Sequence, residues 1–520
     1  MSNLDLIIIG AGINGAGIAR DAAMRGLKVL ILDKGDIGGG TSSYSTRLIH
    51  GGLRYLEFGE LGLVRESLRE RETLLHIAPH LVRPIPILIP IYKGAQRGRT
   101  KIRAGMIAYD LLSPGKSEPR HQMFSRQETL ARSSGLESKD LVGGAIYYDC
   151  QVEFAERLVL ENILSAREHG AQVLTYARVT RIDEQHVEFV YNDKTETVTA
   201  DLVINAAGPW IDQVLQKSAA ADERLIGGTK GTHIALRSFP GAPATAIYLE
   251  ARSDQRPFFV IPWNNNYLIG TTDDRFEGDL DQVHGELREV DYLLKETNKA
   301  FPEANLTRTD VCFTYSGVRP LPFTANTKES GITRRHFIRE HTQNKHLLSI
   351  VGGKLTTYRS LAEECVDLVF KKLGRQSPRC RTGEVELPGS LSPPNVRHAS
   401  ASLDDRVNHR LARIYGSRVK DLLALCVTEP TLAETFNKDR DAIAAEIVFA
   451  FQAELATTLT DCMLRRTMIG LNADLGLNDI DAAAEIGKSY LGWTDKQAVG
   501  AITEYKNHFS ASLRPSASLC

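Results

Sequence analysis

The sequence is poor in three features that mark particular classes of protein. Its seven cysteines among 520 residues form no CxxC pair, which argues against a disulfide framework or a zinc site. No apolar run reaches the roughly 18 residues of a membrane-spanning helix, and the N-terminus lacks the basic segment of a signal peptide. Lys+Arg and Asp+Glu number 63 and 64, a balance that argues against a general nucleic-acid binder. We therefore expect a cytoplasmic protein with no metal and no nucleic-acid partner.

What is present is an ordinary globular composition, 42% hydrophobic and 24% charged, with enough chain for several domains. Residues 388–400 are rich in Pro and Ser and read as a linker. The sequence after it is almost wholly helical in pattern, and Arg465 and Arg466 are expected on a solvated helix face. One apolar stripe at i+4 spacing is typical of a helix face; it comprises Ile447, Phe451, Leu455, Leu459 and Met463.

The first 35 residues read as strand, glycine turn, helix and strand. Gly10, Gly12 and Gly15 form the pattern GxGxxG directly after the apolar run 4–9. In this context the first glycine makes a tight turn, the second lets the backbone approach a pyrophosphate, and the helix N-terminus faces the phosphate charge. Asp33 ends the second strand, where it can accept a hydrogen bond from a ribose hydroxyl. The pattern predicts a dinucleotide site, and an acidic residue here disfavours NADP.

Two later junctions bear on the choice between NAD and FAD. The apolar strand 202–205 enters a small-residue turn ending at Gly208, and the strand 347–351 enters Gly352 and Gly353 before a helix. Three strand–glycine junctions favour FAD, although one alone would fit NAD. Between them, residues 229–272 alternate as in an antiparallel sheet, and the Pro-interrupted run 83–91 is typical of an edge strand or an irregular segment.

Several motifs then resemble one family. Residues 40–57, GTSSYSTRLIHGGLRYLE, resemble the signature of FAD-dependent glycerol-3-phosphate dehydrogenases, and so do 230–233, 317–321, 352–358 and 461–467. The resemblance covers essentially the whole chain. Two positions depart from the pattern: Arg47 stands where many members carry Lys, and Tyr44 is bulkier than expected. The first departure puts the geometry of a flavin or phosphate contact in doubt.

The resemblance implies an α/β protein with a Rossmann-like FAD-binding domain, a mixed or antiparallel substrate domain and an all-α C-terminal domain. FAD-binding segments are expected at about 1–62, 150–215 and 345–375 within a region 1–390. They alternate with a substrate domain at about 80–145 and 216–344, and the helical domain follows at 391–520. The expected cofactor contacts are Gly10, Gly12, Asn14, Gly15, Asp33, Lys34, Thr41, Ser42, Ser43, Arg47, Leu48, Ala207, Gly208, Gly353, Leu355 and Thr356.

The implied reaction is oxidation of sn-glycerol 3-phosphate to dihydroxyacetone phosphate, with hydride transfer from C2 to N5 of FAD. A dianionic phosphate needs fixed positive charge, and Arg54, Arg319 and Lys354 are the candidates, with Tyr55 donating a hydrogen bond. Removing the hydroxyl proton needs a base. We favour His233 as this base, with His50 as a donor that orients the substrate and also contacts it; Arg319 completes the catalytic set.

The electron acceptor is expected to be membrane quinone. Related oxidases use oxygen and carry an insertion before the tail domain, and none is seen between Lys354 and the linker. A glycerol-3-phosphate oxidase or another amino-acid-oxidase-like flavoenzyme is the alternative. A quinone enzyme should touch lipid, so a basic segment is expected to bind anionic lipid on the cytoplasmic face, the other reading being a solvated loop. A homo-oligomer is also expected. The segment contains Lys93, Arg97, Arg99, Lys101 and Arg103.

Overall fold

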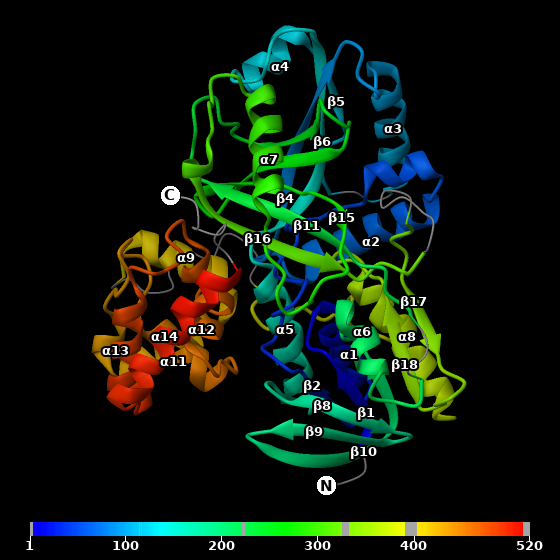
Figure 1. Cartoon of the computed structure of the whole chain (residues 1–520), viewed down its shortest axis with the longest axis vertical. Coiled ribbons are helices and arrows are strands. Elements are labelled where there is room, and N and C mark those ends of the chain that lie inside the picture. Colours follow the sequence, from blue (N-terminus) through cyan, green and yellow to red (C-terminus); the bar gives the residue numbers. More distant parts are fainter. Residues whose placement is uncertain are drawn as a thin grey trace.

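Two β-sheets and a helical C-terminal region make up the molecule (Figure 1). The computed structural model describes residues 4–113, 115, 117–220, 224–324, 332–390 and 403–512. In Figure 1 the first sheet lies below the second, and the C-terminal helices stand beside the junction of the two. This is the expected α/β architecture followed by an all-α domain.

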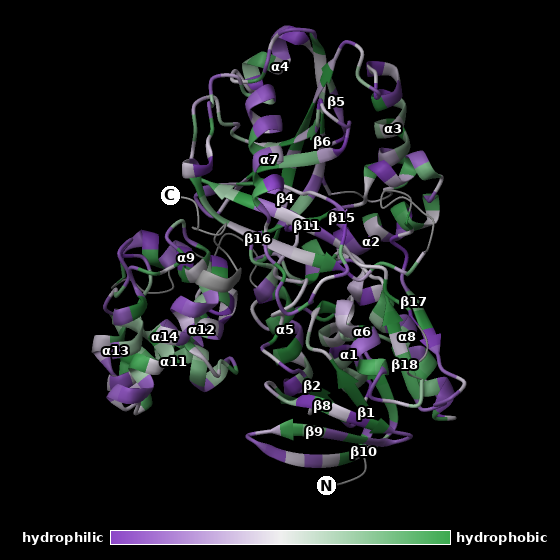
Figure 2. Cartoon of the chain, viewed as in Figure 1, coloured by the Kyte–Doolittle hydropathy of each residue, from purple (hydrophilic) through white to green (hydrophobic). Residues whose placement is uncertain are grey.

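The first sheet is built around β1 (Leu4–Ile9), every residue of which is buried and apolar apart from Asp5 (Figure 2). Such a run forms a strand when both sheet faces are covered. Helices α1 (Ile13–Met24), α5 (Ala155–Glu168) and α8 (Tyr358–Lys372) cover one face, and the β8–β9 hairpin with α6 (Ile211–Leu215) covers the other. The strand order is β17-β18-β10-β1-β2-β7. The other strands are β2 (Val29–Leu32), β7 (Gln172–Leu174), β8 (Arg178–Asp183), β9 (His186–Tyr191), β10 (Lys194–Asn205), β17 (Phe337–Glu340) and β18 (Leu347–Val351).

The parallel pairing of this sheet positions the site. β1 pairs in parallel with β2 and β10, and β10 pairs in parallel with β18. All four strands therefore end at one edge, where ligands bind in folds of this type. The segments that emerge there begin at Gly10, Asp33, Ala206 and Gly352.

The second sheet is mixed, mainly antiparallel, with strand order β15-β11-β14-β13-β12-β4-β6-β3; β16 pairs with β11 and β5 with β6. The run expected at an edge, β4 (Val82–Tyr92), instead lies inside it, between β6 and β12. Its prolines are tolerated because the ladder to β12 contains only the pairs at Ile87 and Leu88. The other strands are β3 (Leu48–Ile49), β5 (Gln122–Ser125), β6 (Leu141–Val152), β11 (Thr229–Leu236), β12 (Ala246–Glu250), β13 (Pro257–Trp263), β14 (Asn266–Gly270), β15 (Asp274–Arg275) and β16 (Val311–Arg319).

The helices near this sheet are α2 (Leu61–Ile77), α3 (Arg99–Leu111), α7 (Leu287–Ala300) and the short α4 (Arg126–Arg132). A 3-10 helix, η1 (Leu53–Phe58), precedes α2. Within the described residues, no helix is both long enough and apolar enough to cross a membrane.

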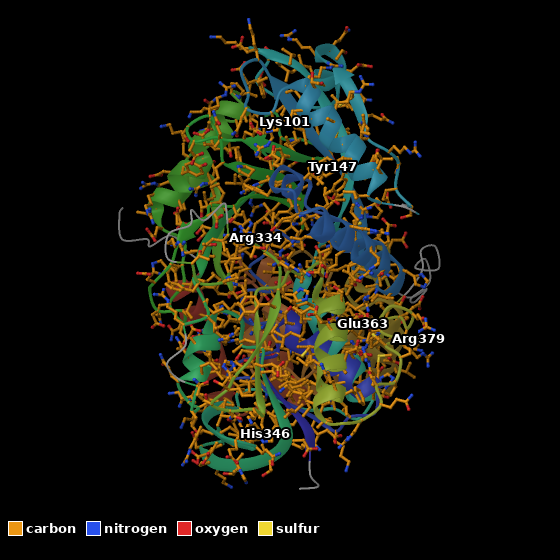
Figure 3. All side chains as sticks on the ribbon, turned by 90° about the vertical axis from the view of Figure 1, so that its right-hand side faces the viewer. Lys101, Tyr147, Arg334, His346, Glu363 and Arg379 are labelled. Carbon is orange, nitrogen blue, oxygen red and sulfur yellow. The ribbon has the colours of Figure 1, made fainter. Side chains whose placement is uncertain are left out.

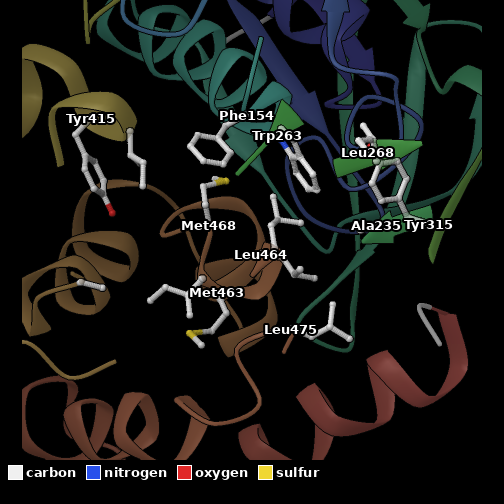
Figure 4. Packing of buried hydrophobic residues seen from close by; sticks show 14 of the residues in the cluster. Phe154, Ala235, Trp263, Leu268, Tyr315, Tyr415, Met463, Leu464, Met468 and Leu475 are labelled. Atoms are coloured by element: carbon white, nitrogen blue, oxygen red, sulfur yellow. The ribbon is translucent and has the colours of Figure 1, made fainter. Parts of the chain in front are cut away.

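The helices of the C-terminal region differ from expectation in where one of them ends. The apolar stripe is not one helix, because α11 (Ala444–Ala453) ends before Leu455, whose φ is +60°, and α12 (Leu459–Arg465) starts anew. Both helices still contribute to one core, because Ile447 of α11 and Leu459 of α12 belong to the same buried cluster. Leu464 and Met468 join Phe154, Trp263 and Tyr315 in that cluster (Figure 4). Residues 391–400 of the expected linker lie outside the described residues. The other helices are α9 (Asp405–Tyr415), α10 (Val419–Thr428), α13 (Ile480–Leu491) and α14 (Asp495–Ser512).

Candidate cofactor cleft and active site

A cleft of about 1360 Å³ runs along the edge where the parallel strands end. All four strand ends of that edge contribute to its wall, as expected for a dinucleotide site in an open α/β sheet. Of the residues predicted to bind the cofactor, the cleft is lined by Gly10, Gly12, Asn14, Asp33, Lys34, Thr41, Ser42, Ala207, Gly208, Gly353 and Leu355.

The first glycine turn is shaped by close backbone contacts. Gly10 has a φ of +107°, and a Cβ there would lie 2.7 Å from the carbonyl oxygen of Ala206. A Cβ on Gly15 would lie 1.9 Å from the carbonyl oxygen of Gly10. Helix α1 follows directly, and its first amide, Ile13 N, donates to Ser42 Oγ at 3.0 Å. The turn thus brings bare backbone to the cleft, as a phosphate group requires.

Asp33 is held rigidly at the end of β2. Its carboxylate accepts hydrogen bonds from the amides of Ala11 at 2.6 Å and Gly35 at 2.8 Å. Burial raises its pKa, and these two hydrogen bonds oppose that change. The neighbouring Lys34 lies 4.6 Å above the ring of Trp210 and pairs with Asp281. The Asp33 carboxylate is thus fixed at the cleft wall, where it can accept a further hydrogen bond, such as one from a ribose hydroxyl.

The remaining predicted cofactor residues do not line the cleft. Ser43 donates to the carbonyl oxygen of Gly38 at 2.7 Å, and Thr356 Oγ1 accepts from His50 N at 3.1 Å. Arg47 is buried, and both of its Nη atoms lie 2.7 Å from the carboxylate of Glu156. Leu48 belongs to β3, where it pairs with Gln151, and Gly15 lies in the packed turn above.

Four cations gather near this cleft, and we call them the cation cluster: Arg54, Arg319, Arg334 and Lys354. Arg319 ends β16 and pairs with Asp273 at 2.8 Å, and it donates to Thr271 Oγ1 at 3.2 Å. Burial lowers its pKa to about 10, and the charge of Asp273 opposes this. Arg334 lies 3.4 Å from the same carboxylate, at mid-height of the molecule (Figure 3). One acidic residue thus faces two guanidinium groups, and positive charge remains in excess.

Tyr55 lies among these cations. Burial raises its pKa, while Arg334, Arg54 and Arg319 all act to lower it. Gly52 positions the short helix η1 that carries it, because Gly52 has a φ of +77° and a Cβ there would lie 2.1 Å from the Tyr55 ring.

The two candidate histidines differ in surroundings. Burial lowers the pKa of His50 to about 4; Asp149 raises it, and Lys354 and Arg334 lower it further. His50 is half-buried, and two members of the cation cluster, Lys354 and Arg334, lie near enough for their charges to act on it.

His233, in contrast, is 2% exposed. Its Nε2 lies 3.0 Å from Thr46 Oγ1, and its ring lies 5.0 Å from that of Tyr315. Burial lowers its pKa well below the usual range, and Arg319 and Arg47 add to this effect. His233 is therefore enclosed by protein on more sides than His50.

Sequence reasoning missed Arg334 and Asp273. Their only signals are a basic pair at 334–335 and an acidic pair at 273–274 after the apolar strand β14. Neither is specific, because such pairs are usually solvated. The expectation for Arg465 and Arg466 is wrong: both are buried and both donate to the carboxylate of Asp36.

The basic segment 93–103 is partly neutralised within the protein. Arg97 pairs with both Glu57 and Glu250, and Lys101 lies 3.1 Å from Glu57. Residues from 99 onward form α3, whose outer face alternates polar and apolar positions (Figure 2). Ile107 and Leu111 on that face are 44% and 77% exposed.

Comparison with known proteins agrees with this arrangement. The family model described as "FAD dependent oxidoreductase" matches residues 5–359, and the model "C-terminal domain of alpha-glycerophosphate oxidase" matches 380–498. A glycerol-3-phosphate dehydrogenase of Synechocystis is 46% identical, over 98% of this chain and 97% of its own. An aerobic glycerol-3-phosphate dehydrogenase of Staphylococcus epidermidis is 33% identical, over 89% and 86%.

Solved structures extend the likeness. The glycerol-3-phosphate dehydrogenase of Bacillus halodurans complexed with FAD has a TM-score of 0.79 at 28% identity, covering 100% of this chain and 97% of its own. The L-alpha-glycerophosphate oxidase of Mycoplasma pneumoniae with FAD bound shares the fold, with a TM-score of 0.57 at 18% identity, over 75% of this chain and 100% of its own.

Proposed function

This chain belongs to the family of FAD-dependent glycerol-3-phosphate dehydrogenases, and from that premise we propose that it oxidises sn-glycerol 3-phosphate to dihydroxyacetone phosphate. The observation that carries the proposal is the cation cluster beside the FAD cleft. Lys354 lines the cleft itself, and its charge acts on His50. A phosphate dianion and a reacting alcohol can therefore be held at one end of the cofactor site.

The residues at the strand ends fit FAD. The glycine turn, the fixed carboxylate of Asp33 and the junctions at Gly208 and Gly353 all line one cleft, which suits a long dinucleotide. Bound FAD supplies the hydride acceptor, N5 of its isoalloxazine ring. The role of this chain is to hold the substrate carbon beside that atom and to receive the hydroxyl proton.

The cation cluster binds the substrate phosphate. Arg319 and Arg334 present planar forks, which match phosphate oxygens better than a single ammonium does. Asp273 keeps both guanidinium groups in place, and Tyr55 donates a hydrogen bond from within the same group. A site with four cations, two of which share the single carboxylate of Asp273, suits a dianion better than the single carboxylate of an amino acid, so the amino-acid oxidase alternative is disfavoured.

His50 is the better-placed base. With a pKa of about 4 it is neutral at pH 7, so one ring nitrogen can accept the C2 hydroxyl proton. Lys354 and Arg334 favour the alkoxide that forms as the proton leaves, which lowers the demand on a weak base. The enclosure of His233 by Thr46 and Tyr315 suits a supporting role for this residue, the reverse of the division expected from sequence.

Anaerobic reduction tests the function directly. Purified protein should be yellow, and glycerol 3-phosphate without oxygen should bleach the flavin absorbance near about 450 nm. Glycerol and an amino acid should leave the colour unchanged. Bleaching by the amino acid alone would refute the assigned substrate.

Membrane quinone is the proposed acceptor. Support comes from the full-length likeness to dehydrogenases and from the lack of an insertion between Lys354 and residue 390 in the sequence. The name of the C-terminal family model favours the oxygen alternative. Aerobic turnover without added acceptor separates the two: stoichiometric hydrogen peroxide would exclude the quinone assignment.

We also propose that the protein works as a peripheral protein, and as a homo-oligomer, on the cytoplasmic face of the membrane. Its contact with lipid would combine the exposed side chains of Ile107 and Leu111 with the cations of 93–103. Because Glu57 and Glu250 pair with Arg97 and Lys101, attraction to anionic lipid would come mainly from Lys93, Arg99 and Arg103. Apolar insertion and charge attraction together are what a surface-bound helix needs.

A further inference from the structure

Arg465, the last residue of helix α12 in the C-terminal domain, and the next residue, Arg466, form ion pairs with the segment that follows β2. Asp36, 5% exposed, accepts from Arg465 Nε at 2.5 Å and from Arg466 Nη1 and Nη2 at 3.0 and 2.7 Å. Asp36 lines the cofactor cleft and begins the loop that carries Thr41 and Ser42 to it. The loop is therefore fixed at its start from a position 429 residues further along the chain.

A second contact reaches the same segment, next to Asp36. Tyr176 lines the same cleft, and its backbone amide donates to the carbonyl oxygen of Gly35 at 3.1 Å. Its hydroxyl donates to Asp461 Oδ1 at 2.7 Å. Asp461 also accepts from Arg465 Nη2 at 2.8 Å, so both contacts belong to one network. Figure 1 shows α12 on the side of the C-terminal helices that is nearest the rest of the chain.

The network holds no spare charge for a phosphate. Two carboxylates, Asp36 and Asp461, face two guanidinium groups, Arg465 and Arg466. Four buried charges that cancel do not attract a pyrophosphate, but they fix each other's positions because any displacement leaves a buried charge unpaired. The arrangement is therefore suited to positioning the cleft wall.

We propose that the C-terminal helical domain retains FAD, by clamping the cleft wall at Asp36 and Tyr176, directly beside the ribose-binding Asp33. Arg466 is the main positioning residue, since it is fully buried, outside the cleft wall and bidentate on Asp36. FAD retention can be measured without substrate or electron acceptor. A negative result would therefore contradict this proposal and leave the proposed reaction unaffected.

The test uses the full chain and a matched pair of variants. Arg466→Lys keeps the charge but loses the fork on Asp36. Arg25→Lys is the control, because it makes the same change at another buried, bidentate pair, with Asp21 at 3.0 and 2.6 Å. Arg25 caps the C-terminal end of α1, the opposite end from the glycine turn, and none of its hydrogen bonds reaches the clamp. Tyr176→Phe is the mild third variant, because it removes only the hydroxyl that donates to Asp461.

Apoprotein is titrated with FAD, flavin fluorescence gives the Kd, and the Tm of each apoprotein is recorded. Arg466→Lys should raise the Kd about tenfold or more, and Tyr176→Phe about threefold or more. Arg25→Lys should lower the Tm and leave the Kd within about twofold. If Arg466→Lys does not fold, Tyr176→Phe decides. An unchanged Kd in every folded clamp variant, or an equal rise in Arg25→Lys, would overturn the proposal.

Discussion

The ammonium nitrogen of Lys354 lies 3.9 Å from the centre of the Tyr55 ring. Among the described residues it has no hydrogen-bond partner. Burial lowers its pKa to about 7; Arg334 lowers it further, and Glu60 and Glu66 oppose this. The aromatic face favours the charged form but does not replace the lost hydration. Lys354 thus changes charge close to neutral pH.

We expect the KM for glycerol 3-phosphate to rise as the pH increases from 7 to 9. The ammonium loses its proton over this range, while a phosphate monoester has already become a dianion above about pH 6. Lys354→Arg should flatten the rise, because a guanidinium keeps its charge. Steady-state kinetics between pH 7 and 9 give the KM of both proteins. If the KM of Lys354→Arg rises with pH as steeply as that of the unchanged protein, the titration belongs to another group.

Arg334 should matter far more than the adjacent Arg335. Arg334 faces Asp273 and the cation cluster, whereas Arg335 is exposed. Arg334→Met should raise the KM about 10- to 100-fold, the equivalent of one or two charge-assisted hydrogen bonds. Arg335→Met is the control and should change it less than about twofold. Equal effects of the two variants would argue against a phosphate site at Arg334.

His50→Asn should lower kcat by about 10²- to 10⁴-fold, the usual contribution of a general base. His233→Asn should act mainly on stability, because it disturbs the buried contacts with Thr46 and Tyr315. Single-turnover flavin reduction and the Tm of each variant separate the effects. A larger loss of reduction rate in His233→Asn than in His50→Asn would restore the assignment expected from sequence.

Replacing both Ile107 and Leu111 by Gln should weaken binding to vesicles of anionic lipid by about tenfold or more, since each loses an exposed apolar side chain. The control is Val427→Gln, which alters an 86% exposed apolar residue of α10 in the C-terminal domain. Sedimentation with vesicles at low and high salt gives both values. Undiminished binding in the double variant would place the contact elsewhere.

The first sheet is predictable from sequence because its signals are local. Residues 4–9 and 29–32 are apolar runs, and the glycines between them have the spacing of a phosphate-binding turn. The observed β1 (Leu4–Ile9) coincides with the predicted run 4–9, and α1 begins directly after the glycine turn, as predicted. All four strand ends around the cleft are expected from local signals of this kind.

Contacts between residues distant in sequence set the limit of what could be predicted for the site. The charge of Arg47 suggests a contact with phosphate, but it is neutralised by Glu156, 109 residues further along the chain. Arg465 and Arg466 look like solvated charges until Asp36 faces them. Leu455 keeps the i+4 spacing, yet a left-handed residue breaks the helix there. In each case pairwise tertiary contacts decide the role, and local patterns carry no information about them.

The three tryptophans lie in three different surroundings, and two of them report on different events. Trp210 lines the cleft beside Lys34, Trp263 is buried where the second sheet meets the C-terminal helices, and Trp493 packs on Phe451 within those helices. Flavin absorbs light at the wavelengths where indole emits. Filling of the cleft will therefore dim Trp210, and separation of the domains will shift Trp263 toward the red, so the chain carries its own optical probes of loading and of domain separation.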